Sequence, residues 1–136
     1  NEALQKWAGV QGANIDYVVK GTNPFTEHYG ALMAEVPDPS DPSTQLNTAF
    51  LSVMQNADVI GFAGEASSHC VLTTLQQVVE NIGKEHLKKF HLLTDCMSPV
   101  APVPGVTPDF PAIADKFLKD MAAEGMTLTI STEFLK

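Results

Sequence analysis

A cysteine at the start of an expected helix is the strongest chemical feature of this sequence. Residues 58–83 read DVIGFAGEASSHCVLTTLQQVVENIG, an apolar run, a turn and a segment of helical periodicity. Cys70 falls at the third position of that helix, where unpaired N–H groups and the helix dipole favour a reactive thiolate. Those N–H groups also suit an oxyanion, so one interpretation of Cys70 is a nucleophile. The other is a small buried hydrophobic side chain.

Lys20 is the second candidate for chemistry. It follows residues 15–19 (IDYVV), whose β-branched and aromatic side chains predict a strand, and it precedes Gly21. An ammonium close to a thiol stabilises the thiolate and can assist proton transfer. The alternative is a solvated charge at a strand end, because most lysines lie on protein surfaces.

The elements that must position these two residues alternate between helix and strand. Helices are expected at residues 2–10, 44–57, 68–82 and 108–124, and strands at 15–19, 59–63, 90–94 and 126–131. This order predicts an α/β fold whose mostly parallel sheet is covered on both faces. Sites in such sheets lie beyond the C-terminal strand ends, so Lys20, residues 64–70 and residues 95–98 should share one edge. Ser67 is the expected N-cap of the helix at 68–82, and Gly83 its C′ residue.

A long connection separates the lysine from the next helix. Residues 21–44 contain Pro24, Pro37, Pro39 and Pro42, which exclude a continuous helix or a central strand. One or two helical turns are expected at residues 28–36. Connections of this length are either functional or solvated spacers, and the sequence leaves both open.

Composition excludes several classes of function. The 136 residues suit one domain, 1–136, with a net charge of −8 and no arginine. This charge argues against a nucleic-acid partner, which requires clustered basic groups. No apolar run approaches the ~20 residues of a membrane span, so no membrane partner is expected. Without a secretory signal, Cys70 and Cys96 are interpreted as free thiols in a reducing, cytoplasmic compartment.

Several ordered motifs resemble one family. GEASSHCVLTT at residues 64–74 resembles the nucleophile motif of the isochorismatase-like cysteine hydrolases, the superfamily of the nicotinamidases. VVKGTNPFTEHYGA resembles the lysine strand of that superfamily, and AEVPDPSDPSTQLN, LLTDCMSPV and EGMTLTISTEFL resemble its later segments. The resemblance covers nearly the whole chain.

The resemblance implies a three-layer α/β/α sandwich of Rossmann-like type and an Asp–Lys–Cys catalytic triad. Cys70 corresponds to the nucleophile and Lys20 to the lysine. A cis peptide is implied between Glu65 and Ala66, which turns the Ala66 amide towards the site to hold the oxyanion with the Cys70 amide. The implied reaction is hydrolysis of a small amide, such as nicotinamide to nicotinate and ammonia, through a thioester. Tyr29, His28 and Glu65 are the candidates for contact with the substrate.

One member of the implied triad has no counterpart here. The family's aspartate, and the Asp and two His that bind its metal, zinc or another divalent ion, lie upstream of the lysine strand. Asp16 lies within the lysine strand and cannot replace an aspartate on another strand. We therefore expect residues 1–136 to be the C-terminal portion of a hydrolase domain, to lack its first strand or strands and a cofactor site, and to be inactive alone. Unpaired strand edges invite association, and the family commonly forms homo-oligomers.

Two other functions stay open at this point. One is a related hydrolase that acts on another small amide or on a carbamoyl compound. The other is a binding domain that keeps the fold without turnover. The reactivity of the Cys70 thiol separates the second from both hydrolases.

Overall fold

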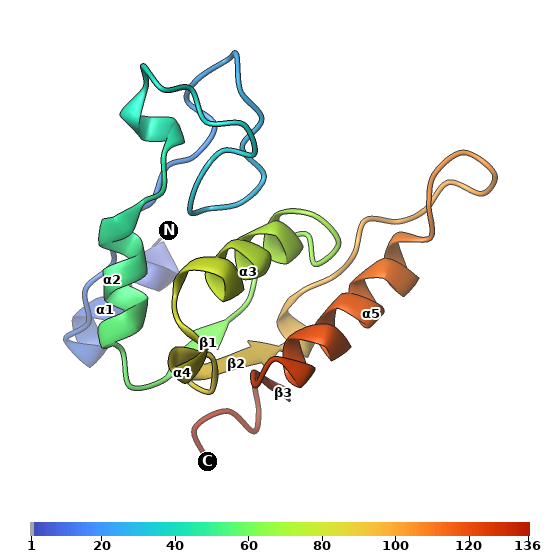
Figure 1. Ribbon diagram of the computed structural model, residues 1–136. Helices are drawn as coiled ribbons and strands as arrows, with labels where there is room; N and C mark the ends of the chain where they lie inside the picture. The colour runs from blue at the N-terminus through green and yellow to red at the C-terminus, as the bar shows by residue number, and fades with distance from the viewer. Residues whose placement is uncertain (1) are drawn as a thin grey trace.

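The chain folds as an α/β structure around a small sheet (Figure 1). The computed structural model describes residues 2–136. Its helices are α1 (Glu2–Gln11), α2 (Thr48–Asn56), α3 (Cys70–Asn81), α4 (Lys84–Leu87) and α5 (Phe110–Ala123), with 3₁₀ turns η1 (Pro42–Thr44) and η2 (Thr94–Cys96). Its strands are β1 (Ile60–Phe62), β2 (Phe90–Leu93) and β3 (Thr127–Thr129). None of the described helices combines the length and the apolar character that crossing a bilayer requires.

The sheet is parallel throughout, in the order β1-β2-β3. Ile60 pairs with Phe90, and His91 pairs with Thr127. Parallel neighbours require a crossover connection, which α3 and α4 supply between the first two strands and α5 supplies between the last two. The expected α/β class and parallel sheet are therefore confirmed.

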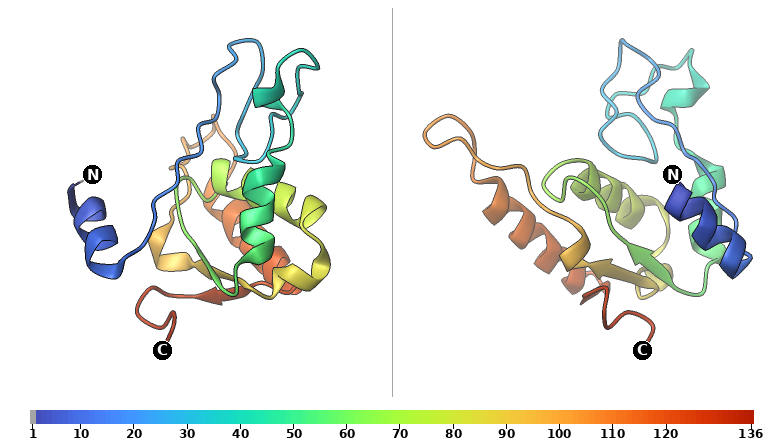
Figure 2. Two further views of the ribbon diagram at one scale, coloured as in Figure 1. Left: turned by 90° about the vertical axis from the view of Figure 1, so that its left-hand side faces the viewer. Right: turned by 180° about the vertical axis from the view of Figure 1, so that it is seen from behind.

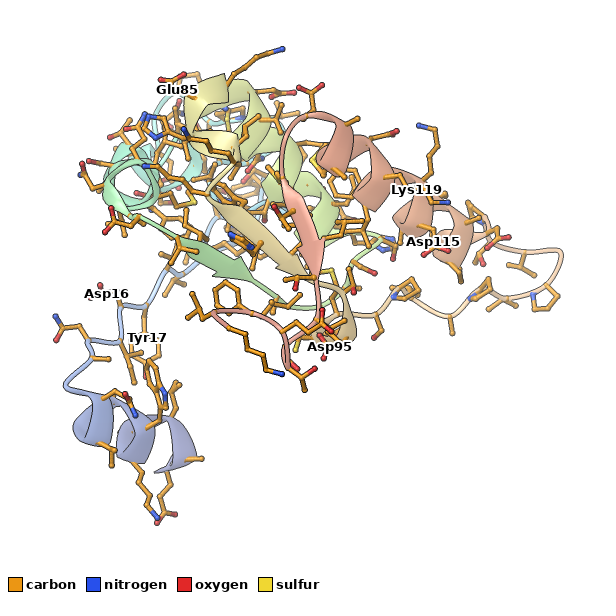
Figure 3. The ribbon with its side chains drawn as sticks, turned by 90° about the horizontal axis from the view of Figure 1, so that it is seen from below. Asp16, Tyr17, Glu85, Asp95, Asp115 and Lys119 are labelled. Carbon is orange, nitrogen blue, oxygen red and sulfur yellow. The ribbon has the colours of Figure 1, made fainter. Side chains whose placement is uncertain are left out.

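The helices of the crossovers gather on one face of the sheet. In the view from below, the three strands lie in front of α3 and α5 (Figure 3). The C-terminal tail runs across the other face, where the Phe134 ring lies 5.5 Å from the His91 ring. The sheet is thus packed most heavily on the side that carries the start of α3.

The core forms where the apolar stripes of the helices meet the strands. Leu75 and Val78 of α3 and Phe90 and Leu92 of β2 are fully buried. Leu51 and Met54 of α2 and Phe117 and Met121 of α5 join the same cluster. Spacings of three and four residues put each helical pair on one helix face, and a spacing of two puts Phe90 and Leu92 on one face of β2. This packing anchors α3, and with it the helix start that bears Cys70.

Residues 15–19 do not form the expected strand. They pair with no strand among the described residues, and Tyr17 and Val19 are 71% and 75% exposed. A strand requires a neighbour for its backbone N–H and C=O groups, and this segment instead leads from α1 past α2 (Figure 2). These residues favour a strand by type, but they remain extended and unpaired because no described strand lies beside them.

Two helix starts also differ from expectation. Asn47, rather than a residue near 44, caps α2 by accepting a hydrogen bond from the Phe50 N–H. The prediction that Ser67 caps α3 is wrong. The helix begins at Cys70, and His69 occupies the N-cap position without a side-chain hydrogen bond to the helix. Cys70 is therefore the first residue of its helix, not the third. Gly83 does follow the C-cap of α3, with φ of +94°.

The connection at 21–44 is ordered without the helical turns expected at 28–36. The Glu35 carboxylate accepts hydrogen bonds from the N–H groups of Tyr29 and Gly30. Gln77 of α3 accepts from Leu32 and Met33 and donates to the Met33 carbonyl. Side chains replace the intrahelical hydrogen bonds, and they fasten this connection to α3 beside the cysteine.

Candidate active site

A sharp turn between β1 and α3 presents Cys70. Gly64 has φ of +144°, and the peptide bond between Glu65 and Ala66 is cis, at the position that the resemblance implies. The Ala66 carbonyl accepts hydrogen bonds from the N–H groups of His69 (3.0 Å) and Val71 (3.2 Å). Because Cys70 is the first helical residue, its own N–H has no intrahelical acceptor. We call residues 64–70 the elbow.

Lys20 reaches the sulfur from the extended segment. Its Nζ lies 3.6 Å from Cys70 Sγ and donates to the His28 carbonyl at 2.8 Å. The two sequence-derived candidates for chemistry are thus in contact although 50 residues separate them. The positive charge faces the atom that would carry negative charge as a nucleophile.

His28 contacts both Lys20 and the residue that follows it. Its Nδ1 accepts a hydrogen bond from the Gly21 N–H at 3.2 Å. Partial burial lowers the pKa of His28 and so does the charge of Lys20, while the Glu35 carboxylate opposes both effects. The neutral ring is the form that can accept from Gly21. His28 therefore acts on the site through its backbone carbonyl and through the turn after Lys20.

A pocket of about 310 Å³ opens at the sulfur. Its lining is largely apolar and comes from the extended segment, the 21–44 connection, α2, the end of β1 and α3: Lys20, Ala31, Phe50, Phe62, Ala63, Gly64, Glu65, Cys70, Val71 and Thr74. An apolar pocket with few polar groups is the usual form of a small-molecule site. The position of Cys70 in its wall makes the thiol accessible to a bound molecule.

The three candidates for substrate contact lie in different places. Glu65 lines the pocket, but its Oε2 accepts hydrogen bonds from the Ser98 backbone and hydroxyl. Tyr29 and His28 are not among the pocket-lining residues. The Tyr29 ring lies 6.4 Å from the ring of His69, which packs 4.8 Å from Phe110. His69 thus has a packing role beside the nucleophile.

Sequence reasoning missed most of the apolar lining. Phe50 of α2 packs against the core, and it also lines the pocket. Thr74 lies one helical turn after Cys70, on the same side of α3, and accepts from the Ala31 N–H. The i, i+4 relation to Cys70 was the available signal for Thr74.

Cys70 has no carboxylate partner among residues 2–136: Lys20 is its only side-chain contact of hydrogen-bond type there. Asp16 lines a separate groove with α2, and it lies on the segment that leads away from the sheet (Figure 3). No grouping of three His, Cys, Asp or Glu suited to a metal occurs in the described part of the chain. These residues therefore do not fit the divalent metal that the resemblance implies.

Comparison with solved structures found a similar fold. Searches against models of protein families and against curated protein sequences found no match. Among solved structures, the yeast nicotinamidase Pnc1p is similar, with a TM-score of 0.58 and 18% sequence identity. The match covers 94% of this chain and 50% of that one, so this chain spans about half the length of its relative. At this identity the likeness shows the fold.

Proposed function

We propose that this chain carries the nucleophile of a cysteine hydrolase that cleaves a small amide, of which nicotinamide is the first candidate. The observation that carries the proposal is the 3.6 Å contact between Lys20 Nζ and Cys70 Sγ at the wall of an apolar pocket. The similarity of the fold to a nicotinamidase supports it. Cysteine acting with a neighbouring cation is an established way to activate a nucleophile.

The proposed reaction forms and then breaks a thioester. The Cys70 thiol gives its proton to a carboxylate, which we assign to an aspartate outside these 136 residues, as the resemblance implies. The thiolate attacks the amide carbon, and the carbonyl oxygen becomes an oxyanion that the N–H groups of Ala66 and Cys70 stabilise. The C–N bond breaks, and the nitrogen leaves as ammonia after it takes the proton. Water then hydrolyses the thioester to the acid and the free thiol.

Pocket dimensions favour a compact, partly apolar substrate. A volume of about 310 Å³ is at the small end of ligand sites. Phe50 and Phe62 line the pocket, and aromatic side chains there favour an aromatic amide. A carbamoyl compound is the second candidate, because its carbonyl would meet the same sulfur and N–H groups.

Ammonia release by the intact protein tests the proposal. We expect nicotinamide, benzamide or a carbamoylated amine to be hydrolysed, and the variant Cys70→Ala to lose the activity. Cys96→Ala is the matched control, since the Cys96 side chain lies outside the pocket. Undiminished ammonia release by Cys70→Ala would refute the proposal.

Trapping the intermediate separates a hydrolase from a binding domain. Hydroxylamine added during turnover should divert the acyl group from Cys70 to a hydroxamate, which mass spectrometry detects. A binding domain would hold the amide without forming either the thioester or the hydroxamate.

A further inference from the structure

The loop that follows β2 is bonded along the elbow. We call residues 96–100 the strap. The Gly64 N–H donates to the Cys96 carbonyl at 3.2 Å, and the Ser67 N–H donates to the Ser98 carbonyl at 2.9 Å. In the other direction, the Val100 N–H donates to Ser68 Oγ at 3.0 Å. Hydrogen bonds in both directions make the elbow and the strap one unit, although about 30 residues separate them in the chain.

A carboxylate closes this unit at its centre. Glu65 Oε2 accepts two hydrogen bonds from one residue, the Ser98 N–H at 3.1 Å and the Ser98 hydroxyl at 3.0 Å. Hydrogen bonds to an ionised acceptor are stronger than neutral ones. Glu65 contributes the carbonyl to the peptide unit whose N–H belongs to Ala66, so its side chain is anchored directly beside an oxyanion donor.

We propose that Ser98 is a positioning residue for the oxyanion site, acting through Glu65. This inference rests on the proposed hydrolase function. With its carboxylate held by the strap, Glu65 fixes the plane of the peptide that carries the Ala66 N–H. Preorganised donors stabilise an oxyanion because they need not reorient during the reaction. Ser98 itself lines no wall of the Cys70 pocket.

The competing explanation is that the bond between Glu65 and Ser98 only holds a loop in place, with no effect on the oxyanion donors. The chain contains a matched control for this explanation. The Asp95 carboxylate also accepts from both the N–H (2.8 Å) and the hydroxyl (2.6 Å) of one serine, Ser131. That pair joins the end of β2 to the segment after β3, and neither residue belongs to the elbow. Ser131→Ala thus removes the same kind of bond without loosening the oxyanion donors.

Steady-state kinetics of the intact enzyme with nicotinamide compare Ser98→Ala with Ser131→Ala. We expect Ser98→Ala to lower kcat about 10- to 100-fold, the size of effect that misplaced catalytic groups produce, and to leave KM within about twofold. Ser131→Ala should retain kcat. Ser98→Thr keeps the hydroxyl and should restore most of the rate. Equal kcat values for Ser98→Ala and Ser131→Ala, with Cys70→Ala inactive, would overturn the positioning role while leaving the hydrolase proposal intact.

Amide hydrogen exchange provides a readout that needs no activity. Ser98→Ala should speed exchange in peptides that span residues 64–69, and Ser131→Ala should not. The rate of Cys70 alkylation should change less than about twofold, since the contact with Lys20 is untouched. Unchanged exchange at 64–69 in a folded Ser98→Ala protein would overturn the inference. If the parent protein hydrolyses no amide and exchange at residues 64–69 is faster only in Ser98→Ala, the contact between strap and elbow stands and the proposed reaction is rejected.

Discussion

Lys20 Nζ lies 3.6 Å from Cys70 Sγ, and the same ammonium donates to the His28 carbonyl. The cation is therefore held from two sides, by the thiol and by the connection that follows it. A lysine on a segment with no paired neighbour would otherwise sample many rotamers. The contact joins the extended segment to the elbow and is the basis of the first prediction.

Lys20→Ala should slow the alkylation of Cys70. The lost attraction is that of an exposed ion pair, at most about 1 kcal/mol, so we expect a two- to fivefold lower rate with iodoacetamide at pH 7. Mass spectrometry of the labelled peptides gives the rate at each cysteine separately. Cys96 is the internal control, and its rate should not change. Lys20→Arg, which keeps the charge, should lose less than Lys20→Ala.

His28 should make the structure around Lys20 sensitive to acid. Burial and Lys20 put its folded pKa below the ordinary value of 6.5. Its contribution to stability is therefore complete above pH 6.5 and is lost as the pH falls through the folded pKa. Protonation also removes the acceptor for the Gly21 N–H.

Thermal melting between pH 7.5 and 5 measures this effect. His28→Asn keeps an acceptor but does not titrate, so its melting temperature should fall less over this range than that of the parent protein. His91→Asn is the control, on the face of the sheet that Phe134 covers, and should keep the parent slope. Equal slopes for the two variants would contradict the assignment to His28.

Gly30→Ala should destabilise the protein because Gln77 occupies the space. A Cβ at Gly30 would lie 2.5 Å from Gln77 Nε2, which donates to the Met33 carbonyl. Displacing Gln77 sacrifices buried hydrogen bonds, for an expected loss of about 1–3 kcal/mol in the free energy of unfolding. Urea titration measures it. Gly9→Ala on α1, where nothing lies within 4 Å, should instead be neutral or slightly stabilising.

The outer edge of β1 should drive association of the 1–136 polypeptide. β1 is an edge strand in the described sheet, and no described strand pairs with its other side. Unpaired edges template further pairing, which a lysine suppresses. Sedimentation velocity should show concentration-dependent association that Val59→Lys reduces. Val106→Lys adds the same charge on the exposed loop before α5 and should have no effect; equal reduction by both variants would point to net charge instead.

Local patterns predicted the elements that pack. α3 and β2 begin and end within two residues of their expected bounds. The spacing of apolar residues along the chain indicates which face of an element is buried, so such elements can be predicted locally. Residues 15–19 show the limit of such patterns. Their composition predicted a strand, but strand formation depends on a neighbour that composition does not reveal.

Helix starts show the same limit at finer scale. Ser67 is a good N-cap by type, but its N–H is bonded to the Ser98 carbonyl of the strap. In the structure α3 begins at Cys70, so the nucleophile candidate is the first helical residue rather than the third. At α2 the start lies after Asn47, whose side chain accepts a hydrogen bond from the Phe50 N–H.

The sequence by itself determined the class of fold and the place of Cys70 in the turn that follows a strand. These follow from residue type and periodicity, which are local. Only the tertiary structure decided the distance between Lys20 and Cys70, the apolar wall that Phe50 contributes, and the bond between Glu65 and Ser98. Each joins segments far apart in the chain, and packing rather than spacing brings such segments together.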